Sequence, residues 1–246
     1  MTSSPTAPAW AKSVTWAKGD ILQPGTYTSH LKDAEAVVHS MGILLEADYK
    51  GVLSGKESVV AGLSKAFSSP KVGSPVNPLD RKPGKGGQGE KAGGQMTYEL
   101  MNRDSAITLA QESEREGVRT FVYISAAAGA PILPSRYITT KREAESTIAS
   151  KMPKLRSIFV RPGFLYDSSR KFTLPIAASG MVGNTVNGLV GGGLTRIFGA
   201  AVVKPLKADL VAEAVVEAMT DDSTRGVLDT KSIEELAAKA WRKTML

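Results

Sequence analysis

Two short segments, apolar at successive positions, place the strongest constraint on the fold of this chain. Residues 119–125 read RTFVYIS, and residues 156–162 read RSIFVRP. A strand with apolar side chains on both faces is typical of the interior of a parallel sheet that is covered on both sides. We therefore expect both segments to be central strands, the second of them ending at Pro162.

Strands and helices are predicted to alternate along the chain. Further strands are expected at 13–18 and 35–40, and helices at 96–117, 135–152, 208–222 and 232–246. This alternation predicts an α/β fold, a doubly wound Rossmann-like parallel sheet. The core would span 1–167, and a C-terminal region, 168–246, would supply a cap on the substrate side and the terminal helices.

Composition excludes several classes of function. The chain has no cysteine, and its two histidines, His30 and His39, are too few for most zinc sites. The net charge is +7, but basic residues do not cluster in long runs and aromatic residues do not interleave with them. That pattern favours an ordinary basic surface. We expect no metal and no nucleic acid as partners.

The stretch GKGGQG at 84–89 matches the G-x-G-x-x-G pattern of dinucleotide-binding turns. A functional copy follows a strand and begins a helix. Here PVNPLDRKP precedes it and EKAGGQ follows, so neither condition is met. We interpret it as part of a flexible Gly/Pro-rich insertion, residues 68–95, with almost no apolar side chains to anchor it.

Two other segments bear on location. The N-terminus carries hydroxyl residues and has no acidic residue before Asp20, which makes it a weak match to a mitochondrial transit peptide. Residues 172–195 contain no charge. Glycines, asparagines and a proline interrupt them, so a small-residue lid is favoured over a membrane span, and peripheral membrane contact is the alternative.

The best candidate for chemistry is the pair Tyr137 and Lys141 in YITTK. Their i, i+4 spacing places both on one helix face. An ammonium beside a phenol lowers the phenol pKa, so Tyr137 could exchange a proton with a carbonyl or alcohol. Ser125 ends a buried strand, where α/β sheets bind ligands, and could donate a hydrogen bond to a substrate carbonyl. The alternative is a solvated helix face with a half-buried tyrosine.

Together these motifs resemble the extended and atypical short-chain dehydrogenase/reductases, an epimerase-like Rossmann superfamily. The stretches VVHSMGILLE, MTYELMNRDSAITLA, YISA, PSRYITTKREAE and VRPGFLYD resemble, more narrowly, fungal mitochondrial members involved in ubiquinone biosynthesis. Those members are relatives of the short-chain-dehydrogenase-like accessory subunit of respiratory complex I. The resemblance covers 13–167 well and is less specific beyond.

This resemblance implies a set of site residues. Ser125, Tyr137 and Lys141 would be catalytic. The cofactor, NAD or NADP, would contact Tyr137, Lys141 and seven further residues: His39, Ser40, Gly42, Asn102, Pro162, Gly163 and Phe164. The family's first strand, glycine-rich turn and helix, which hold the pyrophosphate, have no counterpart in this chain. We therefore expect weak or absent cofactor binding.

Three functions follow as alternatives. The first is an accessory factor in mitochondrial ubiquinone biosynthesis, which would bind a protein complex and a prenylated quinone intermediate. The second is an active NAD(P)-dependent oxidoreductase or epimerase-like enzyme that uses the Ser-Tyr-Lys site. The third is a structural interaction protein with an inactive site. Family resemblance favours the first.

Overall fold

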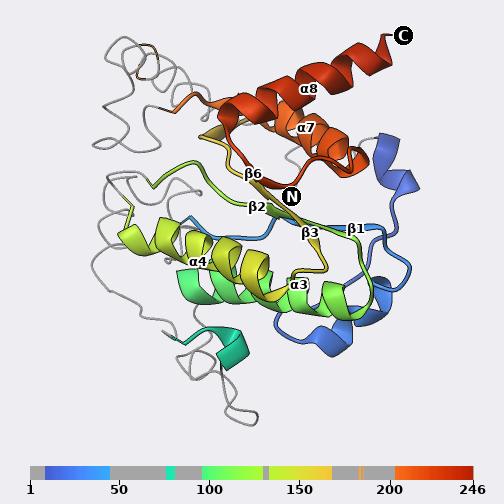
Figure 1. Cartoon of the computed structure of the whole chain (residues 1–246), viewed down its shortest axis with the longest axis vertical. Coiled ribbons are helices and arrows are strands. Elements are labelled where there is room, and N and C mark those ends of the chain that lie inside the picture. Colours follow the sequence, from blue (N-terminus) through green and yellow to red (C-terminus); the bar gives the residue numbers. More distant parts are fainter. Residues whose placement is uncertain are drawn as a thin grey trace, which may run out of the picture.

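A computed structural model describes residues 9–44, 76–80, 96–129, 133–167, 183, 185 and 203–245. Within these ranges, four α-helices flank a parallel sheet (Figure 1). The helices are α3 (Ser105–Arg115), α4 (Ser135–Lys151), α7 (Ala208–Thr220) and α8 (Thr230–Thr244). Within the described ranges, none of the helices has the length and apolar character needed to cross a membrane.

Four parallel strands form the main sheet in the order β1-β2-β3-β6. They are β1 (Ala36–His39), β2 (Thr120–Ile124), β3 (Arg156–Val160) and β6 (Gly226–Leu228). The two fully apolar segments are the two central strands, as expected. Two short strands, β4 (Leu165–Tyr166) and β5 (Leu206–Lys207), form a separate parallel pair. The predicted α/β fold with a Rossmann-like parallel sheet is therefore confirmed.

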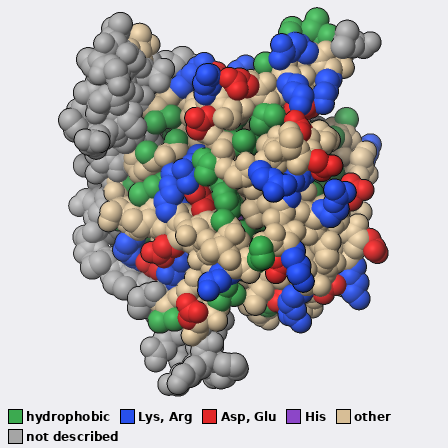
Figure 2. Space-filling model, in the orientation of Figure 1, with side chains coloured by type: hydrophobic (Ala, Val, Ile, Leu, Met, Phe, Trp, Pro, Cys, Tyr) green, Lys and Arg blue, Asp and Glu red, His purple; other side chains and the backbone are tan. Residues whose placement is uncertain are grey.

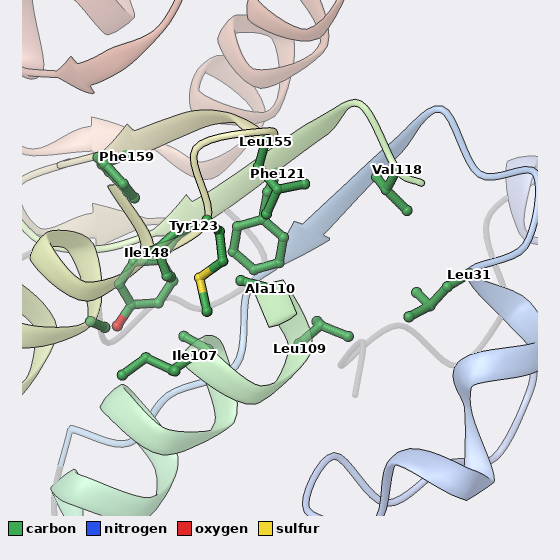
Figure 3. Close-up of a cluster of buried hydrophobic side chains, with 13 residues drawn as sticks. Leu31, Ile107, Leu109, Ala110, Val118, Phe121, Tyr123, Ile148, Leu155 and Phe159 are labelled. Carbon is green, nitrogen blue, oxygen red and sulfur yellow. The ribbon is translucent and has the colours of Figure 1, made fainter. Parts of the chain in front are cut away.

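Helices cover both faces of the sheet. In Figure 1, α3 and α4 lie below it and α7 and α8 above it. Side chains that alternate along β2 fill the two resulting cores: Phe121 and Tyr123 enter the α3 side, and Val122 enters the α7 side. Figure 3 shows the first of these cores, with Phe121 and Tyr123 above Ile107 and Ala110 of α3. Burial on both faces explains why β2 lacks the polar–apolar alternation of a surface strand.

The strand expected at 13–18 is wrong. Residues 9–13 form a short 3₁₀ helix, and residues 14–18 pair with no strand among the described residues. An apolar segment forms a strand only where a neighbour takes up its backbone hydrogen bonds. The outer edge of β1 likewise has no neighbour in the described part of the chain, and Val38 on it is 41% exposed.

Part of the expected flexible insertion, 68–95, is described and is anchored. Residues 78–80 form a 3₁₀ turn, Leu79 packs against the α3-side core, and Asn77 Nδ2 donates a hydrogen bond to Thr147 Oγ1 at 3.0 Å. Leu79 thus supplies an apolar anchor that the composition argument missed. GKGGQG at 84–89 lies outside the described residues, as do 172–195 except for residues 183 and 185.

The helix predicted at 96–117 has two parts. Its first part, η5 (Glu99–Asp104), is a π-helical segment, and regular α3 begins at Ser105. The π-helix is rare, and short π-helical segments often occur at functional sites. Asn102, one of the predicted cofactor contacts, lies in η5, so the irregularity coincides with the candidate site.

Candidate functional site

Tyr137 and Lys141 lie on consecutive turns of α4, as their spacing predicts, and the lysine ammonium lies 5.9 Å from the centroid of the Tyr137 ring. The Lys141 Nζ also lies 5.1 Å from the centroid of the Tyr123 ring. The ammonium is therefore held between two aromatic rings, one from α4 and one from β2. Such cation–π contacts stabilise a positive charge where water is excluded.

Lys141 is a buried cation, only 5% exposed. Its Nζ donates to the Ile124 carbonyl at 3.2 Å and lies 3.5 Å from Tyr123 Oη. No carboxylate among the described residues forms an ion pair with it. Burial lowers the Lys141 pKa to about 8, opposed by the negative charge of Glu145 and reinforced by the positive charge of Arg142. Near neutral pH this amine is poised to exchange a proton.

Tyr137 has the opposite shift from the one that the sequence argument predicts. Its pKa is raised because burial disfavours the phenolate, with a smaller opposing effect from Arg142. Its ring packs edge-on against Tyr98, with centroids 5.9 Å apart. In the described part of the chain no group forms a hydrogen bond with the Tyr137 hydroxyl. That hydroxyl therefore remains available to a ligand, as a donor rather than as a phenolate.

Asn102 fixes the segment that follows β1. Its Oδ1 accepts from the Ile43 N–H at 2.8 Å, and its Nδ2 donates to the Ile43 carbonyl at 3.3 Å. A Cβ at Gly42 would stand 3.0 Å from Asn102 Oδ1 and 3.5 Å from Lys141 Nζ. Glycine thus lets the backbone approach the amide and the ammonium closely. Asn102, Gly42 and Lys141 are brought together, as the resemblance implies.

His39 is buried, and its ring centroid lies 5.4 Å from that of Tyr123. Its Nε2 is 3.1 Å from Ser105 Oγ, and that hydroxyl donates to the Met101 carbonyl at 2.7 Å. Because the hydroxyl proton is already used, Nε2 must carry the imidazole proton, which leaves Nδ1 unprotonated. Burial lowers the His39 pKa to about 4, and the Lys141 charge adds to the effect. His39 is therefore neutral at physiological pH.

Ser125 belongs to a different cluster, the Glu145 network, which comprises Ser125, Arg142, Glu145 and Arg161. Ser125 Oγ donates to Glu145 Oε1 at 2.5 Å and accepts from Arg142 Nη1 at 3.1 Å. Arg161 adds a bidentate ion pair to the same carboxylate. In this conformation the Ser125 proton is directed to Glu145, not toward Tyr137 or Lys141.

The Glu145 network also fixes the loop after β2. Arg142 Nη2 donates to the Ala126 and Ala127 carbonyls at 2.7 and 2.9 Å. Sequence reasoning missed this network, although Glu145 continues the Tyr137–Lys141 spacing by one further turn. It also missed Tyr123, whose hydroxyl donates to the Asn102 carbonyl at 2.5 Å.

The remaining predicted cofactor contacts lie elsewhere. Ser40 is exposed after β1. The Pro162 carbonyl accepts from the Ala127 N–H at 2.8 Å, and the Phe164 carbonyl accepts from the Leu206 N–H at 2.9 Å. A Cβ on Gly163 would stand 2.7 Å from the Lys204 carbonyl oxygen. The turn at 162–164 therefore contacts residue 127 and residues 203–206.

One half of a nicotinamide dinucleotide fits these residues. Tyr137 offers a hydroxyl that no described residue hydrogen-bonds, Lys141 an ammonium, and Gly42 a backbone that a side chain would block. These groups suit the ribose beside the nicotinamide. No described segment combines a glycine-rich turn with the start of a helix, the usual pyrophosphate site. No cluster of potential metal ligands occurs among the described residues either.

Comparison with known proteins finds a clear relative in yeast. No family model matches the chain. MIOREX complex component 2 of Saccharomyces cerevisiae is 39% identical over 174 residues, which is 65% of this chain and 58% of the yeast protein. The two proteins are homologues. Two parts of the resemblance drawn from the motifs are thus confirmed, because the chain has a yeast homologue and a Rossmann-like parallel sheet.

A plant protein shows a weaker similarity. An uncharacterized chloroplastic protein of Arabidopsis thaliana is 27% identical over 166 residues, 60% of this chain and 53% of the plant protein. The chain therefore spans little more than half the length of the curated relatives it matches.

Solved structures similar to this chain include nucleotide complexes. RMD from Pseudomonas aeruginosa with NADPH has a TM-score of 0.49 at 15% identity, covering 90% of this chain and 69% of that one. MoeE5 with UDP-glucose and NAD has a TM-score of 0.46 at 14% identity, covering 93% and 68%. UDP-N-acetylglucosamine 4-epimerase from Bacillus cereus has a TM-score of 0.43 at 13% identity, covering 87% and 67%.

Proposed function

We propose that this chain is a short-chain-dehydrogenase-like accessory factor of a protein assembly in mitochondrial ubiquinone biosynthesis. The observation that carries the proposal concerns the predicted catalytic serine, whose hydroxyl is hydrogen-bonded to other side chains of this protein. Ser125 donates to Glu145 and accepts from Arg142, so no hydroxyl proton is directed at the Tyr137–Lys141 pair. Without that donor, a carbonyl bound there would lack one source of polarisation.

The yeast homologue supports an assembly role, because its name describes it as a component of the MIOREX complex. Mitochondrial location and a prenylated quinone intermediate as ligand rest on the motif resemblance to fungal mitochondrial proteins. The aromatic side chains of Tyr98 and Tyr137 beside the site would suit a quinone ring.

A second candidate function is an active NAD(P)-dependent oxidoreductase or epimerase-like enzyme. The observation that favours it is the Tyr137 hydroxyl, which has no hydrogen-bond partner among the described residues. The Tyr137 ring centroid lies 5.9 Å from Lys141 Nζ, and the Lys141 pKa is about 8. In that case Tyr137 would donate its proton to a substrate oxygen, and Lys141 would bind the ribose and stabilise the resulting phenolate. The nicotinamide would supply the hydride.

A segment exchange in yeast separates these two functions. The matching segment of MIOREX complex component 2 would be replaced by its counterpart from this chain, and ubiquinone would be quantified by mass spectrometry. For an accessory factor, the exchange restores ubiquinone in a strain that lacks the yeast protein. Tyr137→Phe and Lys141→Met then restore it equally well.

Other outcomes would count against the proposal. Loss of ubiquinone with Tyr137→Phe, at unchanged protein level, would favour the enzyme. If deletion of the yeast protein left ubiquinone unaffected, the biosynthetic role would be contradicted.

Cofactor affinity supplies an independent test. The described residues would hold the nicotinamide ribose but offer no pyrophosphate cradle, so we propose that this chain binds NADH and NADPH weakly. Several missing charge-assisted hydrogen bonds, each about 1.5–3 kcal/mol, would lower the affinity by orders of magnitude. Calorimetric titration measures this directly. Micromolar binding that Lys141→Met abolishes would overturn the proposal.

A further inference from the structure

A cationic groove lies at the end of the sheet opposite the candidate site. Arg119 precedes β2, Arg156 begins β3, and Arg225 precedes β6. These three strands are parallel neighbours, so the topology places their amino ends, and hence the three arginines, along one edge. The carboxyl ends, with Ser125 and Arg161, point the other way.

The groove consists of two clefts that share Arg225. One has a volume of about 290 Å³ and the other about 460 Å³. Their lining includes six cationic residues against two anionic ones. The cations are Arg119, Lys154, Arg156, Arg225, Lys239 and Arg242, and the anions are Asp222 and Glu235.

Some of these cations have structural roles. Arg156 Nη1 donates to the carbonyls of Ala218, Asp221 and Thr224, which fixes the C-terminal end of α7. Lys239 pairs with Glu217 and Asp221.

Three other cations of the groove form no ion pair within the part of the chain that the structure describes. Arg225 and Arg242 are exposed, and no described carboxylate lies within ion-pair distance of either; the same holds for the exposed Lys154. The groove therefore has positive charge beyond what the fold uses.

The projecting end of α8 contributes Arg242 to this groove and carries two exposed apolar side chains on another face of the helix. Trp241 is 58% exposed and Met245 is 67% exposed, where the apolar stripe of Ile233 and Ala237 continues beyond the body of the protein. Figure 2 shows Lys and Arg side chains gathered around this end of the helix. Tryptophan and arginine are the residues most enriched at the energetic centres of protein interfaces.

We propose that this groove binds an acidic segment of a partner protein. The inference rests on the proposed role in an assembly and names the surface that serves it. Leu236 in the lining is half-buried and offers apolar surface to a peptide side chain. No aromatic residue is among those that line the two clefts, so they offer no platform on which nucleic-acid bases could stack. The concave shape disfavours a flat bilayer.

The test is fluorescence anisotropy with a fluorescein-labelled oligoglutamate peptide and the whole chain at near-physiological ionic strength. The double variant Arg225→Glu/Arg242→Glu reverses the two unpaired arginines. The matched control, Lys32→Glu/Lys207→Glu, makes the same change in net charge at exposed lysines outside the groove. All four sites are on the surface, and thermal unfolding confirms that both variants are folded.

We expect the chain to bind the peptide, the groove variant to lose about tenfold or more in affinity, and the control to stay within about twofold. Equal losses in both variants would show that peptide binding depends only on the net charge of the chain, which would overturn the proposal. So would no binding by the unmodified chain. Tighter, groove-dependent binding of poly(U) RNA or of phosphatidylglycerol vesicles would replace the peptide with another partner. The yeast exchange assay does not use this peptide, so the proposed function can fail or stand independently.

Discussion

Ser125 Oγ donates a hydrogen bond to Glu145 Oε1 across 2.5 Å, which ties the end of β2 to the middle of α4. The same carboxylate, only 4% exposed, accepts from Arg142 and Arg161. One buried anion thus joins three segments around the loop at the carboxyl end of the sheet. Its removal would leave two arginines without a counterion.

Glu145→Gln keeps the shape of the side chain and removes its charge. We expect the free energy of unfolding to fall by about 3 kcal/mol, because the variant breaks a largely buried ion network. Chemical denaturation measures this. Glu143→Gln is the matched control on the same helix, where the carboxylate is 54% exposed and its partner Arg103 keeps Asp104, so the loss should stay below about 1 kcal/mol. Equal losses would contradict the network's role.

The depressed Lys141 pKa predicts a pH-dependent stability. Between about pH 8 and 10.5 the unfolded chain holds a proton on this amine that the folded chain has released. The free energy of unfolding therefore rises with pH across this window, by up to about 3 kcal/mol from this group. Lys141→Met lacks the contribution. Its stability advantage over the unmodified chain should shrink from pH 8 to 10.5 in parallel denaturation series, and a constant difference would rule the shift out.

Two tyrosines should respond oppositely to loss of the hydroxyl. Tyr123 Oη donates to the Asn102 carbonyl, so Tyr123→Phe removes a buried hydrogen bond and should lower the free energy of unfolding by about 1–2 kcal/mol. Tyr27 Oη is buried and has no hydrogen-bond partner among the described residues, and burial is the main cause that raises the Tyr27 pKa to about 12. Tyr27→Phe should therefore be neutral or stabilising. Equal losses in the two variants would contradict the assignment of the Tyr123 hydrogen bond.

Gly163 should not tolerate a side chain. An added Cβ would stand 2.7 Å from the Lys204 carbonyl oxygen and 3.0 Å from Val203 Cγ1. Gly163→Ala should thus lower the free energy of unfolding by about 1–3 kcal/mol as the turn moves away from β5. Gly25→Ala is the control, since a Cβ there meets nothing within 4 Å. Thermal unfolding of both variants measures these effects. A Gly163→Ala protein as stable as the unmodified chain would contradict the close contact.

Much of the fold could be predicted from local signals. The segments at 119–125 and 156–162 are apolar at successive positions, which indicates strands buried on both faces. Both central strands and the α/β class therefore follow from sequence. Strands of two or three residues, such as β4, β5 and β6, have too few positions for a pattern. The error at 13–18 has a different cause, because strand formation depends on a neighbour that no local pattern specifies.

The candidate site was predictable only in part. Spacing places Tyr137 and Lys141 on one face of α4, and the structure does bring Lys141, Asn102 and Gly42 together. Spacing cannot show that burial outweighs the nearby ammonium and raises the Tyr137 pKa. Nor can it show that the Ser125 hydroxyl turns toward Glu145, since this depends on arginines from two other parts of the chain.

The π-helical segment η5 makes the candidate site sensitive to chain length rather than to side-chain identity. An α-helix advances by about 100° per residue, so deleting one residue between 99 and 104 would restore regular winding and rotate everything before the deletion by about that angle. Tyr98, whose hydroxyl donates to the Leu44 carbonyl, would turn away from its acceptor. A single-codon deletion, which replaces no side chain, could therefore detach the segment after β1 from the helix that holds it.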